Sequence, residues 1–263
     1  MKPSRSRKQI YRDVIGFLAI ACLSVWLVMR GSDNIAYSWH WKQVPRYLFQ
    51  IYDGEFIAGP LLLGLGVTLQ ITVVSLFLAG FFGLVTALLR MSASPVGRLI
   101  AWIYLEVIRN TPLLVQIFFL YFVMAPILDI GRFATAVLAL SLFEGAYASE
   151  IIRAGITSIS KGQWEAAHSL GLSHYDTYRR VILPQAIRRI LPPLTSQAIS
   201  LIKDSALVST IAVYDLTMEG RTIIAETFMT FEIWFTVAAI YLFITLTLSG
   251  FVSFLEKYFP QRA

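Results

Sequence analysis

Six long apolar segments, separated by shorter polar stretches, organise the chain. Most approach or exceed the roughly 20 apolar residues that a helix needs to cross a bilayer. The segment 60–89 is longer than one crossing requires, so we expect it to tilt or protrude. This pattern predicts an all-α, polytopic membrane protein of about six transmembrane helices, at residues 14–29, 60–89, 113–128, 133–152, 193–213 and 232–255.

Composition supports a membrane protein and excludes several other classes. Hydrophobic residues make up 57% of the 263 residues and charged residues 14%, against roughly 25% charged in an average soluble domain. The mean hydropathy is +0.66. A soluble fold of this composition could not cover its surface with polar groups, and the single cysteine, Cys22, excludes an internal disulfide scaffold.

The positions of the basic residues predict the orientation. Cytoplasmic segments of membrane proteins are enriched in lysine and arginine. With the N-terminus inside, fifteen of the 22 basic residues lie inside and five outside, whereas Arg109 and Lys203 lie at or within the membrane. We therefore expect both termini in the cytoplasm, and we read the net charge of +6 as an orientation signal, with no nucleic-acid partner.

The first apolar segment has a second interpretation, because five basic residues followed by a short apolar stretch also describe a secretory signal peptide. No small-x-small cleavage site follows Met29. The orientation of the later segments is the same in either case. Residues 31–59 then lie outside, and scattered aromatic residues predict that they lie along the outer membrane surface: Trp39, Trp41, Tyr47 and Tyr52.

Catalytic and metal-binding motifs are not evident in the sequence. It contains no G-x-x-x-x-G-K-[ST] phosphate loop. The three histidines are too poorly spaced for a metal site. Glu165 and His168 match the Glu-x-x-His pattern of di-iron bundles, but that chemistry needs a second copy, so we interpret the match as chance. We expect that the chain is not an enzyme.

The polar stretch 153–192 predicts a helical hairpin. Ser160 and Gln163 have the spacing of a capping box, and Gly171 suits the left-handed end of a short helix. On that helix, one face is shared by Trp164, Ala167 and Leu170.

A second short helix follows in the same stretch. Ser173 and Asp176 have similar capping spacing, and we expect Pro184 to stop the helix because proline lacks an amide donor. About 40 residues cannot bury enough surface to fold alone. The hairpin therefore packs either on its own bundle or on a separate cytoplasmic protein.

Several motifs resemble the permeases of ATP-binding cassette (ABC) importers. Glu165-Ala166-Ala167, then Gly171 and Leu183-Pro184, resemble the E-A-A-x-x-x-G signature of that family. Other motifs resemble its polar amino acid branch, among which Phe143–Tyr147 is most similar to glutamate and aspartate permeases. The resemblance covers about residues 60–255, and its further motifs are Arg109–Gln116, Ala146–Ile156, Ile182–Ala186 and Lys203–Leu207, the last close to the usual Lys-Asp-Thr-Ser-Leu.

The resemblance implies a type I ABC importer permease fold in a bacterial cytoplasmic (inner) membrane. Two permease chains, identical or paralogous, form the channel, with an ATPase dimer below and an extracytoplasmic binding protein above. ATP and magnesium are bound by the ATPase, so no cofactor is implied for this chain. The implied domains are 1–59 (tail, extra helix and periplasmic segment), 60–255 (permease core with coupling loop 153–192) and 256–263 (cytoplasmic tail).

The resemblance also implies site residues. Those of the ATPase-coupling loop are Gln163, Glu165, Ala166, Ala167, Leu170, Gly171 and Pro184. The candidates for the translocation path are Arg109, Asn110, Thr111, Gln116, Glu144, Lys203 and Asp204.

Two of these residues, Glu144 and Lys203, are charged and central in apolar segments. A lysine or aspartate at the bilayer centre costs about 2.5–3.5 kcal/mol on insertion scales, so both are expected to face the protein interior. They could form a mutual pair, lie beside a charged amino-acid substrate, or act as a fixed ion pair, and Asp204 is the competing partner. Close helix packing is predicted by a stripe of small residues at Ser141, Gly145 and Ser149.

Two other function classes remain as alternatives. A stand-alone secondary transporter or channel often has inverted internal repeats, and no convincing pair is present. An intramembrane enzyme would need a catalytic constellation that the sequence does not contain.

Overall fold

The computed structural model describes residues 37–258, with side chains up to Val252, and isolated positions between residues 15 and 31. The chain divides into two compact units, Met1–Trp41 and Lys42–Ala263, and the fold below is that of the second unit. The predicted first helix at 14–29 and the tail at 256–263 lie largely outside the described residues.

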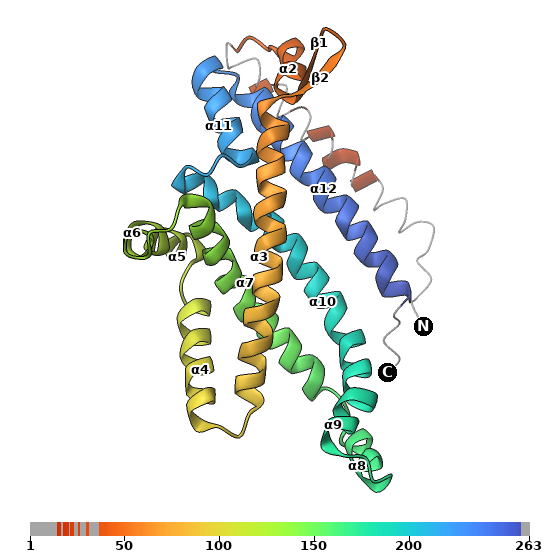
Figure 1. The fold of residues 1–263 in the computed structure, drawn as a ribbon. Helices are drawn as coiled ribbons and strands as arrows, with labels where there is room; N and C mark the ends of the chain where they lie inside the picture. Colours follow the sequence, from red (N-terminus) through yellow and green to blue (C-terminus); the bar gives the residue numbers. More distant parts are fainter. Residues whose placement is uncertain are drawn as a thin grey trace. The chain divides into compact units, whose positions relative to one another are not determined.

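Helices make up most of the second unit (Figure 1). A short outer segment precedes them, comprising η1 (Trp41–Gln43), α2 (Pro45–Leu48), β1 (Phe49–Tyr52) and β2 (Glu55–Ala58). The helices are α3 (Pro60–Met91), α4 (Pro95–Arg109), α5 (Leu113–Phe119), η2 (Leu120–Met124), α6 (Ala125–Leu128), α7 (Arg132–Thr157), α8 (Lys161–Ser169), α9 (His174–Asp176), η3 (Thr177–Ile182), α10 (Leu183–Asp204), η4 (Ser205–Ile211), α11 (Leu216–Thr227) and α12 (Thr230–Tyr258).

The strands β1 and β2 depart from the predicted all-helical pattern within the described residues. They pair antiparallel, with Phe49 opposite Ala58 and Tyr52 opposite Glu55. Asp53 and Gly54 connect them with φ angles of 49° and 80°, which suits the tight turns of hairpins. The aromatic residues here predicted a surface segment, but the short alternation and the Asp-Gly pair are the signals of a hairpin.

Among the residues that the structure describes, three helices are long and apolar enough to cross a membrane: α3, α7 and α12. The pair α4 and α5–α6, bent by 106°, has the length and composition of a fourth, broken span. We expected a single span at 113–128 after a loop, so the helical α4 is a correction. The sequence did not predict α4 because three charged residues interrupt its apolar run: Arg98, Glu106 and Arg109. The local signals of a helix start are nevertheless present, since Ser94 caps the helix and Pro95 begins it.

The predicted fifth segment, 193–213, corresponds to α10 followed by the 3₁₀ helix η4. The expectation that Pro184 stops a helix is wrong, because Pro184 lies in the first turn of α10, directly after the π-helical η3. A wider π turn before the proline accommodates its missing donor and bulky ring. The same arrangement recurs at Pro126, which follows the π-helical η2.

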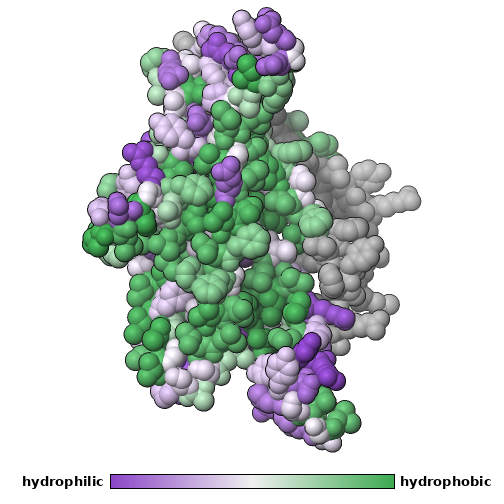
Figure 2. Space-filling model, in the orientation of Figure 1, coloured by the Kyte–Doolittle hydropathy of each residue, from purple (hydrophilic) through white to green (hydrophobic). Residues whose placement is uncertain are grey.

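α7 is the central helix of the bundle. In the most apolar 18-residue stretch of α7, 67% is buried inside the structure. The corresponding stretch of α12 is only 11% buried. Exposed apolar side chains form a broad surface on the face shown in Figure 2, with polar residues gathered at its two ends. The distribution matches a protein whose middle contacts lipid and whose ends contact water.

Small residues allow α7 to approach its neighbours closely. A Cβ atom on Gly83 of α3 would lie 2.7 Å from the Cβ of Ala148, and one on Gly155 of α7 would lie 2.2 Å from Cγ1 of Ile190 on α10. The buried Ser75 also donates a hydrogen bond to the carbonyl of Val137. These contacts fix α3 and α10 against α7.

Substitution Gly83→Ala should separate α3 from α7, because the added methyl group meets Ala148 and backbone atoms of α7. We expect a loss of about 1–3 kcal/mol in the free energy of unfolding. The matched control is Gly66→Ala on the same helix, where an added Cβ meets nothing within 4 Å. Thermal unfolding of the purified protein should separate the two variants, and equal midpoints would contradict this packing.

Candidate functional site

The hairpin that follows α7 lies at one end of the molecule, opposite α11 and the β hairpin (Figure 1). α8 ends at Ser169, and two residues later Gly171, with a φ of +73°, confirms the predicted left-handed conformation. The amide of Leu172 donates to the carbonyl of Ala167 at 3.1 Å, and that of Gly171 donates to His168 at 2.9 Å. This pair of bonds is a Schellman motif, which closes the helix.

The capping box predicted at the start of α8 is wrong. Ser160 makes no side-chain capping bond. The side-chain carbonyl of Gln163 accepts instead from Nε2 of Gln185 on α10, at 3.1 Å. Gln163 therefore links α8 to α10, a contact over 22 residues that local spacing did not predict.

The second predicted cap is confirmed, since Ser173 Oγ accepts from the amide of Asp176 at 3.1 Å. The helix that it starts runs on through η3 into α10. Farther along α10, Arg189 Nη1 donates to the carbonyl of Ser158 at 2.7 Å, just beyond the end of α7. The hairpin is thus attached to the bundle at two points.

One face of α8 packs on the bundle and the other is open. Ala167 is buried, and Trp164 packs with Tyr178 and Ile182. Leu170 was expected on the same face, but it is 80% exposed because the helix ends there and turns it outward. Tyr175 at the other side of the turn is 68% exposed. The open surface of the hairpin comprises Glu165, Ala166, Leu170 and Tyr175.

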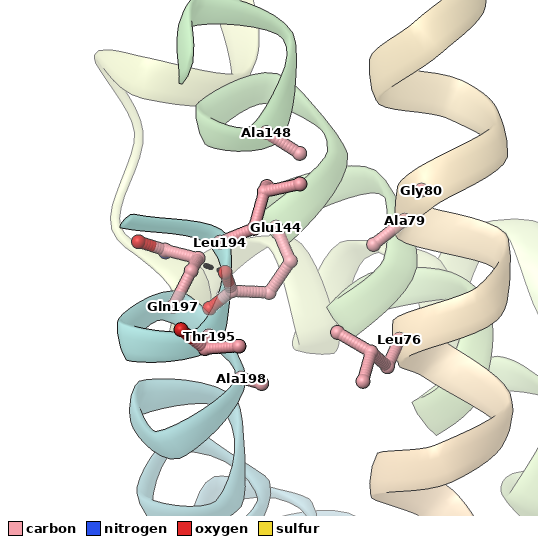
Figure 3. Close-up of a pocket in the computed structure, with 9 residues that line it drawn as sticks. All are labelled: Leu76, Ala79, Gly80, Glu144, Ala148, Leu194, Thr195, Gln197 and Ala198. Carbon is pink, nitrogen blue, oxygen red and sulfur yellow. Dashed lines mark hydrogen bonds between the residues drawn. The ribbon is translucent and has the colours of Figure 1, made fainter. Parts of the chain in front are cut away.

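Glu144 lies in the interior, as predicted, and is only 2% exposed. Its Oε2 accepts a hydrogen bond from Nε2 of Gln197 on α10, and the two side chains point toward one another (Figure 3). Both line a cavity of about 260 Å³ whose opposite wall is formed by Leu76, Ala79 and Gly80 of α3. The second carboxylate oxygen of Glu144, Oε1, accepts no hydrogen bond from a donor among the described residues, and the carboxyl group of Asp204 on α10 lies beside Glu144.

The mutual pair of Glu144 and Lys203 is not formed. Lys203 is exposed and takes part in no ion pair within the described part of the chain. Asp204, the competing partner, is half-buried at the end of α10. The partner that sequence reasoning missed is Gln197, a neutral residue for which no motif gave a signal.

The motif Arg109–Gln116 forms the bend between α4 and α5. Nε2 of Gln116 donates to the carbonyl of Ile108 at 2.7 Å and to Oγ1 of Thr111 at 2.8 Å. Asn110 donates from Nδ2 to the Glu106 side chain at 2.8 Å. Gln116 thus satisfies backbone and hydroxyl acceptors where the helix breaks, which a membrane environment requires.

Arg109 belongs to a charged cluster that the sequence did not predict as a unit. Glu150 Oε1 accepts from Arg90 Nη1 at 2.6 Å and from Arg109 Nη1 at 3.0 Å, and its Oε2 accepts from Arg153 Nη2 at 3.1 Å. Only the spacing of Glu150 and Arg153 could have signalled a pair. The other two contacts join helices that are far apart in the chain.

Asp215, in the loop before α11 and outside the membrane-spanning helices, is fully buried. Its carboxylate caps α11 by accepting from the amide of Met218 at 2.8 Å. Burial raises the pKa of Asp215 to about 6, while the bonds from Met218 and Thr217 oppose that shift. Because this pKa lies above the ordinary value, ionisation of Asp215 costs the fold stability as the pH rises toward and through 6.

No group of three or more histidine, cysteine, aspartate or glutamate side chains could hold a metal ion within the described residues. The polar features just described are an exposed helical hairpin, a buried carboxylate at a cavity and an ionic cluster. None of them combines a nucleophile with a base.

A family model described as "Binding-protein-dependent transport system inner membrane component" matches residues 79–263. The glutamine transport system permease protein of Escherichia coli strain K12 is 43% identical over 202 residues, which cover 75% of this chain and 92% of that protein. The arginine transport system permease protein of Corynebacterium glutamicum is 34% identical over 258 residues, 92% of this chain and 78% of that protein.

Solved structures agree. An amino acid ABC transporter crystallised with histidines is 41% identical with a TM-score of 0.72, covering 76% of this chain and 94% of that one. The methionine ABC transporter MetNI, 18% identical, has the same fold with a TM-score of 0.63 over 76% of this chain and 96% of that one. The family model covers well over half of the sequence, and the predicted permease fold is confirmed. The chain therefore belongs to the family of binding-protein-dependent transport system inner membrane components, the membrane permeases of ABC importers.

Proposed function

We propose that this permease forms half of the channel of a polar amino acid importer. The relatives named above include permeases for glutamine and arginine, and the chain's own motifs are similar to those of the same branch. A second permease, identical or paralogous, completes the channel, and an extracytoplasmic binding protein delivers the amino acid. ATP hydrolysis, with its magnesium ion, belongs to a separate ATPase dimer, so this chain needs no cofactor.

The observation that carries this proposal is the open surface of the α8 hairpin. Leu170 and Tyr175 are large, exposed and apolar at the tip, at the polar end of the molecule away from its lipid-facing middle. Exposed apolar side chains rimmed by polar residues are typical of protein interaction sites. The hairpin is the docking site for the ATPase, with Glu165, Ala166 and Gly171 setting its shape.

Motion of the docked ATPase reaches the membrane through α10. Gln163 of α8 is hydrogen-bonded to Gln185 near the start of α10, and Gln197 of the same helix holds Glu144. The 22 residues of α10 span about 33 Å at 1.5 Å per residue. A displacement of the hairpin therefore moves the residues that surround the buried carboxylate.

Glu144 belongs to the translocation path in this proposal. A carboxylate with one unpartnered oxygen beside a cavity attracts the ammonium group of an amino acid. Lys203 and Asp204 extend the same helix toward the outer end and attract the solute's opposite charges. The translocation path is also predicted to include four residues of the bend between α4 and α5, in addition to the contacts that they make there: Arg109, Asn110, Thr111 and Gln116.

Substitution Leu170→Asp should weaken ATPase docking, because it places a charge in the apolar contact. Gly171→Ala should act through the backbone, since a residue with a β-carbon in the left-handed region costs about 1–2 kcal/mol. We expect reduced co-purification of the ATPase and reduced ATP-driven uptake, with normal membrane insertion. The control is Lys161→Ala at the exposed start of the same helix. Full ATPase association of both variants would contradict the docking site.

Substitution Glu144→Gln keeps the size of the side chain and a hydrogen bond to Gln197 but removes the charge. We expect the complexes to assemble and their uptake of amino acids to fall about tenfold, because the solute loses a hydrogen bond to a charged carboxylate. Uptake rates of cationic and neutral amino acids in proteoliposomes should be compared with those of Glu226→Gln, an exposed carboxylate on α11. Unchanged uptake and preference would remove Glu144 from the path.

The orientation is tested with single cysteines in a Cys22→Ser background. A cysteine at Ser38 should react with an impermeant thiol reagent added to intact cells, because residues 31–59 are predicted outside. A cysteine at Gly162, where an added Cβ meets nothing within 4 Å, should react only after the cells are opened. The reverse pattern would contradict the distribution of basic residues as an orientation signal.

A further inference from the structure

Three arginines on three helices share a single carboxylate. Arg90 comes from α3, Arg109 from α4 and Arg153 from α7, and all donate to Glu150. Arginine is always charged in proteins, so the cluster carries a surplus of two positive charges when Glu150 is ionised. No second carboxylate bonds to these arginines among the described residues.

Most of the donors in this cluster are available. A guanidinium group has five N–H donors in a fixed fork. Across the three arginines, the contacts with Glu150 are four in number, two of them from Arg153. The side chains are 28% exposed for Arg90, 45% for Arg109 and 36% for Arg153, so the remaining donors are open to a ligand.

Two of the three arginines lie at helix ends, since Arg109 is the last residue of α4. Arg90 is the penultimate residue of α3, at the end predicted to be cytoplasmic. α4, which ends at Arg109, exposes the apolar side chains Trp102, Ile103 and Val107 on more than one side of the helix. A phospholipid whose headgroup reaches the arginines therefore has the apolar surface of the same helix available for its chains.

We propose that Arg90, Arg109 and Arg153 form a binding site for the phosphate of an anionic phospholipid in the cytoplasmic leaflet. This site rests on the orientation in the proposed function. Glu150 holds the three guanidinium groups together, and their free N–H groups bind the phosphate oxygens, for which the planar fork of arginine is well suited. Basic pockets between membrane helices on the cytoplasmic side bind anionic headgroups in this way.

The site also answers an energetic requirement. Uncompensated charge near the hydrocarbon is costly, and three guanidinium groups close together repel one another. One carboxylate neutralises one of them. An anionic headgroup supplies the missing negative charge from the membrane itself, without a further acidic residue in the chain.

The test uses the complex purified with its ATPase and exposed to equal amounts of phosphatidylglycerol and phosphatidylcholine. Native mass spectrometry counts the lipids retained. We expect Arg109→Gln to lower the retention of phosphatidylglycerol about fivefold, as for the loss of one basic residue at an anionic surface. The matched control is Arg98→Gln on the same helix, an exposed arginine outside the cluster, which should retain the lipid as the unmodified chain does.

Glu150→Gln separates lipid binding from a purely structural role. The glutamine keeps one oxygen that accepts hydrogen bonds from the arginines, and loss of the negative charge raises the surplus positive charge, so retention of phosphatidylglycerol should be equal or higher. If the cluster only joins helices, Glu150→Gln and Arg109→Gln should both lower the unfolding temperature with no lipid preference, and that result would overturn the proposal. Equal retention of the two lipids by the unmodified complex would also overturn it.

Inorganic phosphate distinguishes a lipid headgroup from a free anion. We expect excess phosphate to leave the retained phosphatidylglycerol in place, because the acyl chains contribute to binding. Displacement of the lipid by phosphate alone would overturn the lipid assignment. Lipid retention is measured without transport, so an incorrect substrate class leaves this result unaffected, and the cysteine labelling tests the orientation separately.

Discussion

The close approach of α7 to α3 and α10 is the constraint on which the rest of the structure depends. Gly83 and Gly155 leave no room for a side chain at the two crossings. Lipid supplies no hydrophobic force between helices, so contact of this kind and interhelical hydrogen bonds must hold the bundle. Because α7 is fixed on both sides, its polar residues are placed with little freedom.

Both polar sites of the membrane region follow from this placement. On one side of α7, Glu144 meets Gln197 of α10 at a cavity bounded by α3. On another, Glu150 meets Arg90 of α3 and Arg109 of α4. The two carboxylates are six residues apart, about 9 Å along the helix, and they point in different directions at 100° per residue. A single helix therefore separates the cavity beside Glu144 from an ionic cluster that joins helices.

The hairpin is connected to the same framework through α10. That helix begins beside α8, passes Ile190 at its closest contact with α7, and reaches Gln197 in the membrane. The π-helical turn precedes Pro184, and the helix continues through Pro192 and Pro193 without ending. In the proposed function, a helix with one end at the docking hairpin and the other at the buried carboxylate is what energy coupling between subunits requires.

Local patterns in the sequence determined the class of the protein and much of its hairpin. Apolar length predicted the helices at 60–89, 133–152 and 232–255, because a helix satisfies its backbone hydrogen bonds within one segment, as lipid requires. The roles of Gly171 and Ser173 were predictable from adjacent residues, whereas the cap predicted at Ser160 was wrong and Gln163 bonds to the distant Gln185. Tertiary structure alone decided the partner of Glu144, the convergence of three arginines on Glu150, the link from Gln163 to Gln185 and the exposure of Leu170. Each of these depends on how distant helices pack, and a side chain's partner across helices leaves no periodic trace in the sequence.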